Sequence, residues 1–146
     1  MTTTRRRVGT VPGSTLAAIA VGGALGATGR YGAGVAWPTP DGGVPWSTFG
    51  VNVVGCFAIG LLFVALTEGT GPPHPLARPF LGTGLLGGFT TFSAYAVEAD
   101  LLVAEGRAAV ALGYVFGTLA AAVLAAQAGV WSARATARAA RRRRSR

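Results

Sequence analysis

Four runs without a charged residue constrain this chain more than any other feature. Each run is about as long as, or longer than, the roughly 20 residues that an α-helix needs to cross the hydrocarbon core of a bilayer. All five acids and thirteen arginines of the 146-residue chain lie outside them. The runs are Val8 to Gly29, Gly42 to Thr67, Pro79 to Val97 and Ala108 to Ala133. The sequence therefore predicts an all-α membrane protein with four transmembrane helices.

Turn-forming residues between the runs set the expected helix limits. Proline and glycine cluster before the first helix and between the later ones, where they favour loops. We expect a basic lead over residues 1–13, a four-helix membrane domain over residues 14–132 and an arginine-rich tail over residues 133–146. The expected helices cover residues 14–37, 45–67, 76–104 and 108–131.

The third run has a composition that a lipid-facing helix does not need. The stretch from Gly84 to Glu98 contains a glycine pair, two threonines, a serine and three aromatic residues. Adjacent Gly87 and Gly88 weaken a helix, and hydroxyl side chains can bond the backbone groups that a break releases. We expect an interruption over residues 87–92. Unwound backbone at membrane depth is tolerated where it is buried in protein or lines a cavity, so a break predicts a binding site.

The arginines are distributed unequally between the loops. With four spans, eleven arginines fall on the side that holds both termini and two, Arg30 and Arg107, on the other. The positive-inside rule then predicts a multi-pass protein of the cell membrane with both termini in the cytoplasm. The tail has no interleaved aromatic residues and follows a span directly, so attraction to anionic membrane lipid is favoured over nucleic-acid binding.

Uncharged polar side chains recur on three of the predicted helices. They are Thr48 and Asn52, the stretch from Thr90 to Ser93, and Tyr114 with Thr118. None of these rows contains an acid, which argues against proton or cation coupling through a carboxylate. Neutral donors suit an anion, although Asn52 could equally tie two helices together.

Two further features fit an anion without requiring one. The rims of Phe92 and Tyr95, three residues apart, carry the positive edge of the ring quadrupole, but ordinary helix packing explains them as well. Arg30 near a helix end either attracts an anion or anchors the helix at the interface. No nucleophile with a base and no metal cluster is visible, so no enzyme activity is expected.

Three motifs resemble, in order and spacing, the Fluc (CrcB) family of fluoride channels. The resemblance covers nearly the whole chain except the arginine tail, and the third motif is the most specific. The motifs are Gly23-Ala24-Leu25-Gly26-Ala27-Thr28-Gly29-Arg30-Tyr31, Thr48-Phe49-Gly50-Val51-Asn52-Val53-Val54-Gly55 and Gly87-Gly88-Phe89-Thr90-Thr91-Phe92-Ser93-Ala94-Tyr95.

The resemblance implies a passive, fluoride-selective channel that lowers cytoplasmic fluoride by export. The subunit would pair with an antiparallel copy to form two pores around a central structural sodium ion. By resemblance, Asn52 matches the pore asparagine, Phe92 the first pore phenylalanine and Tyr114 the helix-four tyrosine, with Thr118 a possible hydroxyl of the polar track. Arg30 matches the vestibule arginine and Glu98 the acid just past the break. The backbone carbonyls of Gly87 and Thr90 match the sodium ligands, and Ser93 lies in the same polar row as Thr90.

The chain departs from the family pattern in two places. Tyr95 replaces the second pore phenylalanine, and we hypothesise that one of the two aromatic positions is degenerate here. The charge bias indicates a fixed orientation, which favours pairing with a related subunit of opposite orientation over the family default of pairing with itself.

Two other functions remain open at this point. A non-transporting membrane assembly or anchor subunit would explain the tail and the glycines but gives the Thr-Thr-Phe-Ser stretch no purpose. A small exporter of cationic compounds also has four spans, but needs an acid in the first helix, which this chain lacks.

Overall fold

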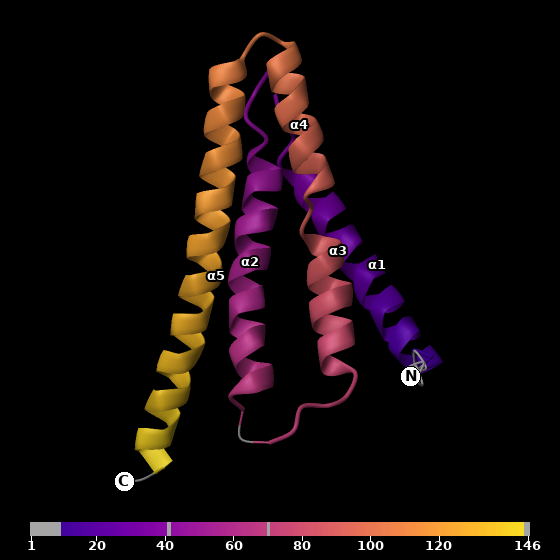
Figure 1. Cartoon of the computed structure of the whole chain (residues 1–146), viewed down its shortest axis with the longest axis vertical. Helices are drawn as coiled ribbons and strands as arrows, with labels where there is room; N and C mark the ends of the chain where they lie inside the picture. The colour runs from indigo at the N-terminus through magenta and orange to yellow at the C-terminus, as the bar shows by residue number, and fades with distance from the viewer. Residues whose placement is uncertain (1–9, 41, 70, 145–146) are drawn as a thin grey trace, which may run out of the picture.

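The computed structural model describes residues 10–40, 42–69 and 71–144, with the backbone alone for residues 141–144. Every regular element in these ranges is helical, as predicted (Figure 1). In chain order the elements are α1 (Gly13–Ala36), α2 (Trp46–Thr67), η1 (Arg78–Leu86), α3 (Gly87–Phe89), α4 (Ser93–Ala104) and α5 (Ala108–Arg144).

Three stretches within the described residues are long and apolar enough to cross a membrane. They are Trp46–Thr67, Arg78–Ala104 and Ala108–Ala140. The stretch predicted as the first span forms α1, a continuous helix of 24 residues. Its many glycines keep it less apolar than the other three.

Large apolar side chains point outward along the helices instead of into a shared core. Leu16 on α1, Phe63 on α2 and Leu124 on α5 are 55%, 55% and 69% exposed. The small buried cluster that does form consists of Leu102, Ala111 and Tyr114. A chain with this much exposed apolar surface is suited to a lipid environment.

The helices pair through glycines that allow one backbone to touch another. Helix α1 packs chiefly on η1 and α3, and α2 packs chiefly on α5 (Figure 1). A Cβ on Gly26 would lie 2.7 Å from the Phe89 amide nitrogen, and one on Gly60 would lie 3.0 Å from the amide nitrogen of Val130. Close backbone approach at small residues is the usual way that helices associate in membranes.

The third helical stretch changes conformation along its length. Its first part, η1, has wide turns, in which the amide of Gly87 donates to the carbonyls of both Gly82 and Gly84. Gly87 and Gly88 were predicted to begin the interruption, but both are helical. The backbone leaves the helix at Thr90, where ψ is 161°, and α4 begins at Ser93. The prediction of the break was therefore too long at its N-terminal end, because close contact with α1 holds the glycine pair in the helix.

The last helix is longer than predicted. It does not end near Trp131 but continues through the arginine-rich tail to Arg144. The alanines between the arginines explain this result, because alanine and arginine are both strong helix formers. The start of α1 and the end of α5 lie at the same end of the bundle (Figure 1).

Candidate functional site

Asn52 holds the backbone at the point where the third helical stretch is interrupted. Its amide nitrogen donates to the carbonyl of Thr91 at 2.9 Å, and its carbonyl oxygen accepts from the amide of Thr91 at 2.9 Å. The two bonds replace the partners that Thr91 would have in a continuous helix. Asn52 therefore ties α2 to the gap, which is the structural role that its sequence position left open.

This clamp leaves two carbonyls without a donor. In an α-helix the amide of Thr91 would donate to the carbonyl of Gly87, but here it donates to Asn52. Among the described residues no hydrogen bond reaches the carbonyl oxygen of Gly87 or of Thr90. These two oxygens are the ones that the family resemblance assigns to sodium.

Hydroxyl groups close the two helix ends that face the gap. The Thr90 hydroxyl donates to the carbonyl of Leu86 at 2.9 Å, at the end of α3. The amide of Ala94 donates to the Thr91 hydroxyl at 3.1 Å, at the start of α4. The Leu86 carbonyl also accepts the Thr90 amide at 2.9 Å, whereas the Thr91 hydroxyl satisfies an amide that the start of α4 would otherwise leave free. Ser93, predicted to line the pore, is exposed, and its hydroxyl lies 3.4 Å from that of Thr91.

Glu98 gathers two of the predicted polar side chains. It accepts hydrogen bonds from the Thr48 hydroxyl at 2.7 Å and from the Tyr114 hydroxyl at 2.8 Å. The polar rows on α2 and α5 are thus joined to an acid, although the sequence analysis treated them as free of one. Thr48 and Glu98 are 50 positions apart and lie on different helices, so no local sequence pattern indicates this contact.

Tyr95 lies at the centre of an aromatic row. Its ring centroid is 5.7 Å from that of Phe92 and 5.4 Å from that of Tyr114, with planes tilted by 47° and 48°. Its hydroxyl donates to the Val115 carbonyl on α5 at 2.9 Å. The hydroxyl that distinguishes Tyr95 from phenylalanine is therefore occupied, whereas Phe92 remains 79% exposed.

A surface pocket of about 520 Å³ opens beside the gap. Helices α2, α4 and α5 and the gap itself all contribute to its wall. Four of the predicted pore residues line it, namely Asn52, Phe92, Tyr95 and Thr118. Cys56 lines it as well.

Thr118 presents an unsatisfied hydroxyl at this pocket. The residue is only 4% exposed, and its hydroxyl oxygen has no hydrogen-bond partner among the described residues. A buried donor without a partner is costly, so its presence in a pocket wall indicates a ligand or water. Thr118 also lines a second pocket of about 420 Å³ together with Tyr114.

Arg30 and Gly87 line neither of these pockets, whereas Thr90, the other predicted sodium ligand, lines the first one. Arg30 is half-buried on α1, and its Nε atom is buried without a partner in the described residues. The part of the chain that the structure describes has no group of three or more His, Cys, Asp or Glu side chains suited to a metal. A cation would therefore depend on backbone oxygens.

Comparison with known proteins identifies the family. The family described as CrcB-like protein, Camphor Resistance (CrcB), matches residues 17–130, which include every element that forms the pockets. The chain belongs to the CrcB-like family.

Curated relatives of this CrcB-like chain carry names that state an activity. It is 53% identical over 119 residues to fluoride-specific ion channel FluC 1 of Streptomyces coelicolor, covering 82% of this chain and 77% of the relative. It is 54% identical over 127 residues to FluC 2 of Nocardia farcinica, covering 87% and 90%. It is 46% identical over 112 residues to FluC of Paracoccus denitrificans, covering 77% and 88%.

Proposed function

We propose that this CrcB-like chain is a subunit of a fluoride-specific ion channel, as its relatives' names state for them. The observation that carries the proposal is the pocket beside Thr91, which Asn52, Phe92 and Thr118 line together. The chain is a channel protein and not an enzyme. An anchoring subunit would have no use for this pocket, and no observation favours it.

Neutral donors and ring rims are suited to passing fluoride. The ion holds its water strongly, so a pore must replace the hydration shell with groups that bind it without trapping it. The Thr118 hydroxyl supplies a donor, and the exposed Phe92 ring supplies a positive edge. Asn52 acts mainly by holding the gap open, because its own amide is bonded to Thr91.

The full assembly goes beyond one chain. In our proposal α1 is a fourth transmembrane helix, the gap at Thr90–Phe92 lies within the bilayer, and two subunits pair in antiparallel orientation to form two pores. The pocket is open at the surface of a single chain, which supports a second subunit as its remaining wall. Both termini face the cytoplasm, in line with eleven arginines on their side against two on the other.

A structural sodium ion at the centre of the pair fits the donors that the chain offers. The free carbonyls of Gly87 and Thr90 are hard oxygen ligands, which suit such a cation. When bound, the ion would supply positive charge and join the two subunits.

The partner in the pair is the least determined part of the proposal. The unequal arginine distribution favours one orientation in the membrane, and an antiparallel pair then needs a related subunit of opposite orientation. Pairing with a second copy of the same chain is the alternative.

Fluoride efflux from liposomes tests the function. The chain, purified from its native membrane with any subunit that stays bound, should release fluoride and retain chloride. Chain reconstituted alone should show little efflux if the partner is a different subunit, and full efflux if it pairs with itself. Absence of fluoride efflux from both preparations would contradict the channel assignment.

A further inference from the structure

The C-terminal part of α5 extends past the helix on which it packs. Helix α5 has 37 residues, and at about 1.5 Å per residue it is on the order of 55 Å long, against about 30 Å for a hydrocarbon core. Its neighbour α2 ends at Thr67, and Figure 1 shows the yellow end of α5 running on beyond it. The arginine-rich extension, residues 135–144, is therefore a helical arm that no other described element covers.

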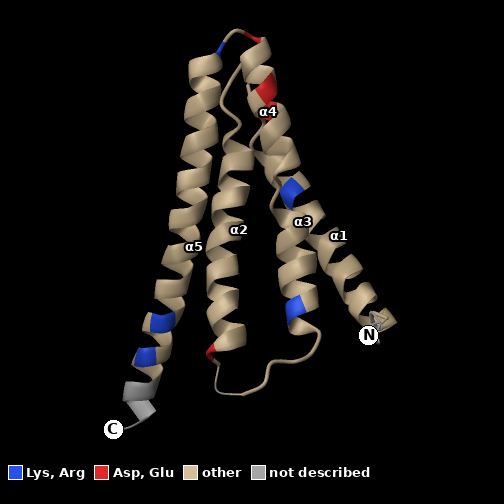
Figure 2. Ribbon diagram, in the orientation of Figure 1, with Lys and Arg blue, Asp and Glu red and all other residues tan. Residues whose placement is uncertain are grey.

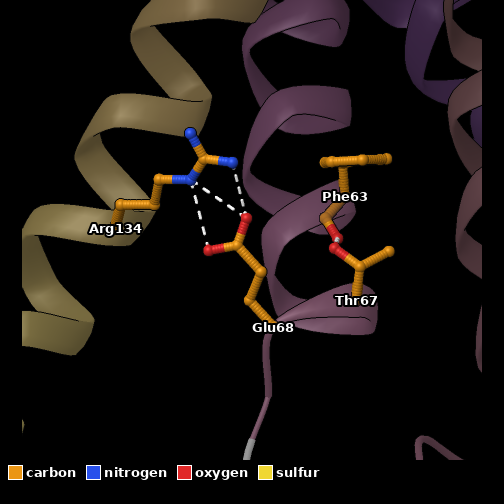
Figure 3. Close-up of polar contacts among 4 residues, drawn as sticks. All are labelled: Phe63, Thr67, Glu68 and Arg134. Atoms are coloured by element: carbon orange, nitrogen blue, oxygen red, sulfur yellow. Dashed lines mark hydrogen bonds and ion pairs between the residues drawn. The ribbon is translucent and has the colours of Figure 1, made fainter.

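An ion pair fixes the base of this arm. Arg134 meets Glu68 through two nitrogens, with Nε 3.0 and 3.2 Å from the two carboxylate oxygens and Nη2 2.6 Å from Oε1 (Figure 3). Glu68 directly follows the last residue of α2, where an arginine also meets the negative end of the helix dipole. The hydrogen bond from Arg134 lowers the pKa of Glu68, so the carboxylate stays ionised and paired.

Arg138 is the other arginine of α5 whose side chain the structure describes. It lies one turn beyond Arg134 and borders a surface pocket with Arg134 and Glu68, but among the described residues it forms no ion pair. Apart from Glu68, the described acids are Glu98, Asp100 and Glu105, which lie on α4 or in the turn after it. Figure 2 shows these acids at one end of the bundle and the arginines of α5 at the other.

Trp131 marks the depth at which the arm leaves the membrane. It is 65% exposed and lies three residues before Arg134 and seven before Arg138, so the three share one face of α5. Exposed tryptophans concentrate at the level of lipid headgroups. At about 1.5 Å per residue, Arg134 and Arg138 lie about 4.5 and 10.5 Å beyond Trp131 along the helix, which places them near the level of the phosphates.

We infer that the arginine arm, residues 135–144, binds anionic phospholipid headgroups, with the Glu68–Arg134 pair holding its base against α2. The partner is a phosphate of the bilayer surface, because the arm follows directly from a membrane helix and arginine matches phosphate geometry. Five arginines of the sequence after Arg134 fall within this arm, which is the density typical of segments that bind anionic lipid. The inference does not depend on fluoride conduction.

Fluorescence quenching in vesicles of defined composition tests this inference. Cys56→Ala removes the native cysteine, and a dye is attached to a new cysteine made by Ala140→Cys. A small fraction of the phosphatidylcholine carries a quencher on its headgroup. We expect quenching to rise about twofold when about a quarter of the phosphatidylcholine is replaced by phosphatidylglycerol. The rise should disappear in about 0.5 M salt, which screens exposed charges.

Charge removal provides the matched controls. A chain with Arg138 and Arg141 to Arg144 changed to glutamine should lose the response to phosphatidylglycerol, and an Arg107→Gln chain, altered at the opposite end, should keep it. Equal quenching in both lipid mixtures with the unaltered arm would overturn the inference. The inference would also be overturned if a short RNA relieved the quenching while phosphatidylglycerol had no effect, because that outcome would identify a nucleic-acid arm.

Discussion

The glycine contacts of this chain and the gap at Thr91 represent opposite ways of joining helices. At Gly26, Gly60 and Gly129 one backbone lies directly on another, and a Cβ would contact main-chain atoms. Around Thr91 the helices are joined by side-chain hydrogen bonds from Asn52 and border an open pocket. The comparison shows that a polar gap persists because tightly packed helices on both sides keep it from closing.

Gly55 lies where the two kinds of contact meet. A Cβ on this residue would collide with the methyl group of Thr90, so the absence of a side chain makes room for the Thr90 side chain at the end of α3. Asn52 is three residues earlier on the same helix and clamps Thr91. One turn of α2 thus provides both the space and the hydrogen bonds for the gap.

The largest effect should follow from filling a glycine contact. Gly26→Ala places a methyl group against the backbone around Phe89, where no side chain can move away, and we expect a loss of about 3 kcal/mol in stability. Gly32→Ala on the same helix is the control, because a Cβ there meets no atom within 4 Å. Thermal denaturation in detergent measures both. Equal stability of the two variants would show that the contact is not tight.

Removing the clamp should be the next largest change. Asn52→Leu leaves the amide and the carbonyl of Thr91 without partners, which costs about 2 kcal/mol, and the gap should lose its shape. Thr91 and Phe92 line the pocket, so we expect fluoride efflux to fall once they are no longer held in place, by about tenfold or more, which corresponds to a barrier raised by about 1.4 kcal/mol. Thr28→Val, which removes an exposed hydroxyl bonded only to its own helix, is the control and should leave efflux unchanged.

Substitution of Thr118 should change fluoride efflux without lowering stability. Thr118→Val removes a buried hydroxyl that has no partner, so stability should stay the same or rise by about 1 kcal/mol. Fluoride efflux should nevertheless fall severalfold, and Thr118→Ser should retain it. If Thr118→Val reduced stability and left efflux intact, the hydroxyl would be a structural group and not a pore group.

The two aromatic positions should differ in the same assay. Tyr95→Phe removes the hydrogen bond to Val115, and we expect a loss of about 1 kcal/mol in stability with efflux preserved. Phe92→Ile removes the exposed ring edge, and efflux should fall strongly while stability changes little. Equal loss of efflux in both variants would refute the hypothesis that one aromatic position is degenerate.

The smallest effect concerns the pH dependence of the Glu68–Arg134 pair. Because Arg134 lowers the pKa of Glu68, the pair contributes stability above the ordinary carboxyl pKa and loses it as the pH falls through the lowered value. Both side chains are exposed, so the change is small. The melting temperature of the native chain should decline slightly in that acidic range, and that of Glu68→Gln should not show this decline.

Local sequence was sufficient to predict most of the helices and the family. Charge-free runs and turn residues predicted the positions of α1, α2 and the start of α5 to within a few residues. They could not predict where the third helical stretch is interrupted, because that depends on Asn52, 39 residues away from Thr91. The contact of Glu98 with Thr48 was not predicted either, because these two residues are 50 positions apart in the sequence.

The roles of the predicted site residues stay predictions, but the structure shows which of these residues lie together. Asn52, Phe92, Tyr95 and Thr118 do meet at one pocket. The hydrogen bonds of Tyr95 and Tyr114 to Val115 and Glu98 depend on how α4 packs on α5, which no spacing within one helix reveals.

The wide turns of η1 place a limit on insertions and deletions. A helix with such turns needs more residues per revolution than an α-helix, so its residue count sets the angle at which the chain enters the gap. Deleting one residue between Arg78 and Leu86 would rotate the rest of the segment about its axis, by less than the roughly 100° that one residue contributes in an α-helix. Thr91 would then face away from Asn52, so the exact length of η1 is as important for the gap as the identity of any side chain in it.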